Sequence, residues 1–287
     1  MTKKLKAAAV SISVNTTLLI SKIALALLTN SIGLLAESAH SLFDLLASVL
    51  AWLGIKKAEE PDDHNHHYGH EKFETLSSFL QALLITGTAF IVMWEAYKKF
   101  QNPEPVTNSE WGILLMILTI PVAYLTAKYL SKTAGKEGGS QALEADSAHF
   151  STDILGSVAV LAGLIMAKFG FKIGDPLAAF AVGAIMLYIS IHLGKKSFWV
   201  FMDFCPEADR MELIEKILNK TRTEGRIIRY HKLKARMTGS KILLEFHIHV
   251  PKNLSIVEAH QIASDVKKEL KQLVPEIKEA TIHIEPD

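Results

Sequence analysis

Apolar residues fill the first two thirds of the chain in blocks of about 20, separated by short polar stretches. A helix of that length crosses the ~30 Å hydrocarbon core of a bilayer. The sequence therefore predicts a polytopic α-helical membrane protein with six transmembrane helices. They are expected at residues 7–29, 33–55, 75–97, 111–130, 145–169 and 175–199.

The last part of the chain has mixed charges and short apolar runs. Periodicity predicts one helix, two strands joined by a turn at Gly239, an amphipathic helix and a final strand. They are expected at residues 209–223, 226–236, 241–250, 256–273 and 280–285. This αββαβ order predicts a small α+β, ferredoxin-like domain with both helices on one face of its sheet. We therefore expect two domains, residues 1–205 and 206–287.

Lysines indicate the orientation of the spans. Eleven lie at the two ends of the membrane domain and in the second-to-third and fourth-to-fifth loops, against four on the opposite side. The positive-inside rule then places both termini in the cytoplasm, as a multi-pass protein of the inner membrane. Lys22 lies inside the first span and is not counted. A cleaved signal peptide ending near Ala26 is the alternative, but the apolar run continues past that point.

Two spans contain the same pattern. Residues 37–49 and 146–158 are identical at seven of thirteen aligned positions, including a histidine and, four residues later, an aspartate. Residues i and i+4 share one face of a helix. Two such helices packed face to face would bring together two imidazoles and two carboxylates, from His40, Asp44, His149 and Asp153.

That shell of nitrogen and oxygen ligands suits Zn²⁺, and it has too few oxygens for Ca²⁺ or Mg²⁺. An Asp at the centre of a membrane helix costs roughly 3 kcal/mol on insertion scales, so it usually marks a pathway or a partner. Each His–Asp pair alone could instead be a local helix-stabilising hydrogen bond; the repetition disfavours this interpretation. Glu37 and Asp146, three residues before each histidine, are expected to face water near the helix ends; guidance of ions into the site is the alternative.

Other histidines lie outside the spans. The loop at 59–72 holds four, with two aspartates, a composition typical of metal-binding tracts, although a plain polar loop is the alternative. In the C-terminal part, alternation puts His247 and His249 on one strand face with Glu245, and His283 and Glu285 on another. Each of these histidines, taken alone, is more typical of an ordinary surface residue.

Charge and cysteine content argue against several other classes of function and site. The net charge of +1 and the lack of a basic, aromatic-interleaved stretch argue against a nucleic-acid partner. The single cysteine, Cys205, excludes an internal disulfide and a cysteine-based zinc site.

Together, the six spans, the histidine loop after the second span and the αββαβ domain resemble the cation diffusion facilitator family of metal/proton antiporters. The resemblance implies a homodimer in a lipid bilayer, with residues 1–205 as the transport domain and 206–287 as a cytoplasmic metal-binding and dimerisation domain. It implies a transport site at His40, Asp44, His149 and Asp153, where His40 favours zinc and leaves cadmium as an alternative. It implies a loop site at Asp63, His66 and His70, and a cytoplasmic site at His231, His247, His260, His283 and Glu285.

The expected function is therefore efflux of a divalent cation in exchange for protons, with Zn²⁺ as the expected ion. Zn²⁺ would be both the transported and the regulatory ion, with no organic cofactor. Two alternatives from other classes are a membrane metal sensor and an intramembrane metalloenzyme. The enzyme would need an open coordination position and a general base, and no His-Glu-x-x-His motif is present.

Overall fold

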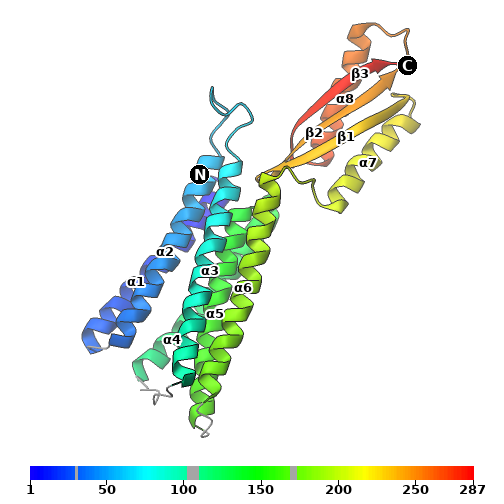
Figure 1. Cartoon of the computed structure of the whole chain (residues 1–287). Coiled ribbons are helices and arrows are strands. Elements are labelled where there is room, and N and C mark those ends of the chain that lie inside the picture. The colour runs from blue at the N-terminus through cyan, green and yellow to red at the C-terminus, as the bar shows by residue number, and fades with distance from the viewer. Residues whose placement is uncertain (30–31, 102–109, 169–172) are drawn as a thin grey trace. The chain divides into compact units, whose positions relative to one another are not determined.

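The computed structural model describes residues 1–29, 32–101, 110–168 and 173–287 (Figure 1). Within these ranges, the side chains of residues 29, 32–40, 110–116, 160, 163–165, 167–168 and 175 lie outside the description. The chain divides into two compact units, Met1–Phe198 and Trp199–Asp287.

The first unit consists of long helices that run side by side (Figure 1). One helix lies at the position of each predicted span: α1 (Lys3–Thr29), α2 (Ile32–Ala58), α3 (Lys72–Gln101), α4 (Glu110–Lys136), α5 (Gln141–Lys168) and α6 (Gly174–Phe201). Among the described residues, three stretches are long and apolar enough to cross a membrane: Lys3–Leu28, Lys72–Gln101 and Pro176–Phe201. The helices α2, α4 and α5 have similar lengths, and each includes side chains outside the description.

Small residues let these helices approach closely, as is usual in membrane bundles. A core of mainly alanines joins α1, α2, α4 and α5, and includes Ala8, Ala51, Leu130 and Ala142, all essentially inaccessible to solvent. Ala8 and Ala142 lie near the beginnings of α1 and α5, whereas Ala51 and Leu130 lie near the ends of α2 and α4. That half of the bundle is therefore tightly closed.

The contact of α2 with α3 at position 54 requires a glycine. A Cβ placed on Gly54 would lie 2.4 Å from the Cβ of Ser77. We therefore expect Gly54→Ala to destabilise the protein by about 1–3 kcal/mol, the usual cost of overpacking, and to lower its melting temperature in detergent. A Cβ placed on the exposed Gly135 of α4 would have nothing within 4 Å, so Gly135→Ala is the matched control. Equal melting temperatures for both variants would contradict the tight α2–α3 contact.

The second unit has the predicted αββαβ order, with element bounds within three residues of those expected. Its elements are α7 (Ala208–Thr223), β1 (Arg229–Thr238), β2 (Lys241–Val250), α8 (Ile256–Leu273) and β3 (Ile277–Pro286). The sheet order is β1-β2-β3, with β1 antiparallel and β3 parallel to the central β2. A capping box between Ser255 and Glu258 begins α8.

Alternation along β2 separates the two faces of this sheet. Ile242, Leu244, Phe246, Ile248 and Val250 are buried in one core together with apolar residues of α7 and α8. Both helices therefore cover the same face, as predicted. The other face presents the polar side chains of the three strands, and the histidines among them are described below.

Candidate metal sites

The repeated His–Asp pattern places its described members together. The ligand atoms of Asp44, on α2, and of His149 and Asp153, on α5, all lie within 4.8 Å of one another. The Nε2 of His149 is 3.1 Å from Oδ1 of Asp44. His40 lies one turn before Asp44 on α2, but its side chain is outside the described residues. Three members of the predicted four-residue shell thus converge from two helices.

The environment of His149 fits a metal ligand. Its side chain and that of Asp44 are almost fully buried, with exposed fractions of 2% and 8%. Its Nδ1 is buried and has no hydrogen-bond partner in the described part of the chain. A buried polar atom without a partner is costly. One imidazole and two carboxylates are also ligands that Zn²⁺ accepts. The donor set therefore suits a divalent cation.

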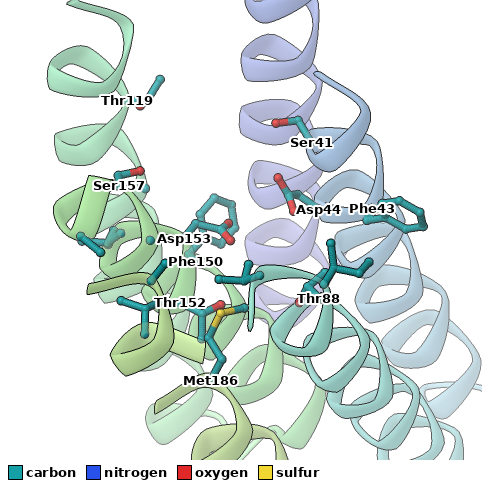
Figure 2. A pocket seen from close by; sticks show the side chains of 18 of the residues that line it. Ser41, Phe43, Asp44, Thr88, Thr119, Phe150, Thr152, Asp153, Ser157 and Met186 are labelled. Atoms are coloured by element: carbon teal, nitrogen blue, oxygen red, sulfur yellow. The ribbon is translucent and has the colours of Figure 1, made fainter. Parts of the chain in front are cut away.

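A cavity of about 620 Å³ reaches this cluster and is lined by Asp44 and Asp153, which face it from different helices (Figure 2). Its remaining walls come from the later parts of α1 and α3, such as Glu95, and from the earlier parts of α4 and α6, such as Thr119. The cavity therefore extends toward the end of the bundle where α1 and α3 finish. The opposite half is closed by the alanine-rich core described above.

The position of Asp146 differs from the one that we predicted. We predicted that it would face water near a helix end, yet it is 0% exposed. The Oγ of Ser48 donates a 3.0 Å hydrogen bond to its Oδ1, and Ser48 is itself 2.6 Å from Ser11 Oγ and 2.8 Å from Asn15 Nδ2. The prediction failed because α5 begins at Gln141, more than a turn earlier, and α1 covers this position.

Asn15 connects this polar network to the cluster of Asp44, His149 and Asp153, because its Nδ2 also donates to the backbone carbonyl of Asp44, at 3.2 Å. Sequence reasoning missed both Asn15 and Ser48. The sequence does contain a signal for them: each of two adjacent apolar spans has a small polar residue, and such residues can hydrogen-bond to each other between helices in a membrane.

The loop histidines form a second cluster. Ligand atoms of Asp63, His66 and His70 lie within 4.8 Å of one another. The Nδ1 of His70 is 3.0 Å from the carbonyl of Pro61, a contact that fixes the ring and directs Nε2 toward Asp63, at 3.3 Å. Backbone N–H groups of Asn65 and His66 donate to Asp63 Oδ1 and hold the pKa of that carboxyl at about 2. Asp63 is therefore ionised at neutral pH, as a ligand must be.

A third group lies on the open face of the sheet and is centred on Glu285. Its Oε1 is 2.7 Å from His247 Nδ1 and 3.7 Å from His283 Nε2. Its Oε2 is 2.9 Å from His249 Nε2 and 3.2 Å from His231 Nε2. The ligand atoms form two sets that share this carboxylate, each within 4.8 Å. One carboxylate that faces two pairs of imidazoles can bridge two metal ions.

Strand register explains this convergence. His231 pairs with His247, His247 with His283, and His249 with Glu285 across the three strands. An irregularity after His231, where Lys232 has φ 51°, inserts an extra residue into β1. The hydrogen bond from His247 lowers the pKa of Glu285, so the carboxylate is charged at neutral pH.

The structure differs from the predicted cytoplasmic set at two residues. His249 was predicted to share a strand face with His247 but was not assigned to the site, although it contacts Glu285 and is nearly buried. His260 was assigned to it, but lies exposed on α8 and belongs to neither set within the described residues. The sequence alone did not predict the register between β2 and β3, and this register is what places His249 opposite Glu285.

Known proteins match the chain along almost its whole length. Residues 8–202 match the family model of the cation efflux transmembrane domain, and residues 206–287 match that of the cation efflux protein cytoplasmic domain. An uncharacterised transporter of Methanocaldococcus jannaschii is 33% identical over 264 residues, covering 92% of each chain. The cation-efflux pump FieF of Shewanella oneidensis is 30% identical, covering 96% of this chain and 92% of its own. A solved structure of CzrB is 34% identical and covers 29% of this chain and 98% of its own, with a TM-score of 0.27.

These matches define the class of protein as an integral membrane transporter of divalent metal cations. The chain belongs to the cation efflux, or cation diffusion facilitator, family. Its members are transporters and not enzymes, so the alternative of an intramembrane metalloenzyme is wrong.

Proposed function

We propose that the chain exports Zn²⁺ from the cytoplasm in exchange for protons, through a transport site formed by His40, Asp44, His149 and Asp153. The observation that carries this proposal is the convergence of the described ligands, Asp44 with His149 and Asp153, on a cavity inside the bundle. Two-nitrogen, two-oxygen coordination favours Zn²⁺, and Cd²⁺ is the nearest competitor.

Proton exchange follows from the chemistry of these ligands. A metal ion binds neutral imidazole and ionised carboxylate, so metal binding releases protons and protonation releases metal. Six membrane spans with both termini in the cytoplasm put the closed half of the bundle at the cytoplasmic side. The cavity then faces outward, where incoming protons would displace the ion.

The other two clusters have supporting roles in this proposal. Asp63, His66 and His70 form a loop site at the cytoplasmic side of the membrane domain, residues 1–205. Residues 206–287 form a ferredoxin-like domain that binds regulatory zinc on its open sheet face and pairs with a second copy in a homodimer of the inner membrane. The proposed cytoplasmic site comprises His231, His247, His260, His283 and Glu285. The contacts of His249 with Glu285 support adding His249, whereas His260 joins neither ligand set among the described residues of a single chain.

Zinc flux into proteoliposomes under an imposed pH gradient tests the proposal. We expect Asp153→Ala to lower the pH-driven flux by at least about tenfold, the smallest loss that removal of even an outer-shell partner causes, because it removes one oxygen ligand of the proposed site. Unchanged pH-driven flux in this variant would remove Asp153 from the transport site. Metal binding without flux in the unmodified protein would favour the sensor.

A further inference from the structure

Asp146 has no role in the function proposed so far, although it is an acidic residue buried in the closed half of the bundle. It is 0% exposed, and its Oδ2 has no hydrogen-bond partner in the part of the chain that the structure describes. A buried polar atom without a partner is costly. An acidic side chain inside a membrane helix usually marks an ion pathway or a partner. One oxygen of Asp146 is therefore free to bind a ligand.

Hydrogen bonds from α1 and α2 hold the other oxygen, Oδ1. The Oγ of Ser48 donates to it at 3.0 Å. Because Ser48 uses its only hydroxyl proton in this bond, Ser11 and Asn15 both donate to Ser48, at 2.6 and 2.8 Å. All three side chains are nearly inaccessible to solvent. They orient the carboxylate of Asp146 in the way that outer partners orient the ligands of metal sites.

Asp146 lies on the same face of α5 as two proposed ligands of the transport site. It precedes His149 by three residues and Asp153 by seven, which is the spacing of one helix face. On α2, Asp44 and Ser48 are likewise four residues apart. The contacts of Asp44 with His149 and of Ser48 with Asp146 show that these two faces meet. A rise of 1.5 Å per residue puts Asp146 about 4.5 Å from His149 along the axis of α5.

The next turn toward the closed end of the bundle is apolar. Ala51 on α2 and Ala142 on α5 are both 0% exposed and belong to the alanine-rich core. The wall of the cavity includes Asn15 but, among the described residues, neither Ser48 nor Asp146. Asp146 therefore lies between the cavity and the apolar closure. An ion that moves from the closed end along the contact of α2 with α5 meets Asp146 first.

We propose that Asp146 and the hydroxyl of Ser48 form an entry subsite, which binds a divalent cation from the cytoplasm and passes it to the transport site. This inference rests on the proposed function, which puts the closed half of the bundle at the cytoplasmic side. Zn²⁺ binds most tightly to nitrogen and sulfur ligands, so one carboxylate and one hydroxyl hold it weakly. Weak binding suits a transit position, because an ion has to leave each position that it enters.

The test measures zinc flux through the full-length protein in inside-out and right-side-out membrane vesicles, which load it from the cytoplasmic and the outer side. Asp146→Asn removes the charge and keeps an oxygen that accepts from Ser48. We expect the KM for cytoplasmic zinc to rise at least about tenfold, because local charge of one sign raises the on-rate of a counter-ion by about 10–1000-fold. The KM for outer zinc should stay at the wild-type value, because that ion reaches Asp44 through the cavity.

Two further variants make this result specific. Ser48→Ala keeps the carboxylate but removes the hydrogen bond that orients it, so it should raise the cytoplasmic KM alone, by a smaller factor than Asp146→Asn. Glu144→Gln is the matched control. It removes an equal charge from α5 at a half-exposed position, where the side chain binds Lys196 at 2.6 Å. Its KM should match wild type from both sides.

Asp153→Ala separates this inference from the proposed function. If that variant transports zinc at the wild-type rate, the proposed transport site is wrong. If it does not, but Asp146→Asn keeps the wild-type cytoplasmic KM, Asp146 forms no entry subsite. An equal rise of KM from both sides, or an equal effect of Glu144→Gln, would also overturn the proposal. Should Asp146→Asn fail to fold, Ser48→Ala decides the question, because an unchanged cytoplasmic KM in that variant contradicts the subsite.

Discussion

Replacing His149 by alanine is expected to lower zinc flux by at least about 100-fold. Loss of an outer-shell partner alone costs metal sites 10–100-fold in affinity or activity, so loss of an imidazole that the proposed site uses as a direct ligand should cost at least as much. The Nε2 of His149 lies 3.1 Å from Oδ1 of Asp44, and removal of His149 would take away the nitrogen ligand that α5 contributes between the two carboxylates. Initial rates of zinc entry into proteoliposomes, followed with an enclosed zinc indicator, measure the effect.

His192 provides a matched control for this substitution. It is also a histidine in an apolar helix, α6, but it is exposed and belongs to no cluster among the described ligands. His192→Ala should therefore transport zinc at the wild-type rate. A similar loss in both variants would point to a general effect on the bundle, and a wild-type rate for His149→Ala would exclude this residue from the ion pathway.

The proximity of Asp44, His149 and Asp153 could be predicted because most of the information for it is local. Helical periodicity fixes the relative direction of His149 and Asp153, and the repeat indicates that a second helix carries the same pair. Sequence periodicity does not say which neighbour covers a given position. Asp146 was therefore misplaced in water, because its burial depends on α1 packing against α2 and α5, a contact between residues far apart in the chain.

In the histidine cluster of the C-terminal domain, too, the local pattern was predictable and the pairing of distant segments was not. Alternation correctly predicted the shared face of His247 with His249, and of His283 with Glu285. It could not predict that β3 pairs parallel to β2 in a register that places Glu285 opposite His249. Nor could it place His260, because the helix α8 covers the opposite face of the sheet through Ala259, Ala263 and Val266.

Glu285→Gln is expected to eliminate both metal sets of the cytoplasmic domain together. The two sets share this carboxylate and no other side chain, and an amide loses the negative charge that faces four imidazoles. We expect the variant to retain less zinc per chain than wild type after gel filtration, measured by elemental mass spectrometry on the full-length protein. Zinc at 100 times its Kd should stabilise the wild-type domain by about 2.7 kcal/mol, and this gain should be lost in the variant.

Glu245→Gln is the matched control for Glu285→Gln, because it tests whether the loss of zinc depends on the carboxylate that the two sets share. It is exposed on β2, and alternation puts it on the same sheet face as His247 and His249. Glu245→Gln therefore removes an equal charge from the same surface without touching either set. If both substitutions lower the zinc content equally, zinc is held by the general negative potential of the face. If only His231→Ala and His247→Ala lower it, each by about one ion, two independent sites exist and Glu285 does not bridge them. Simultaneous loss from the single change at Glu285 is the result that a shared carboxylate requires.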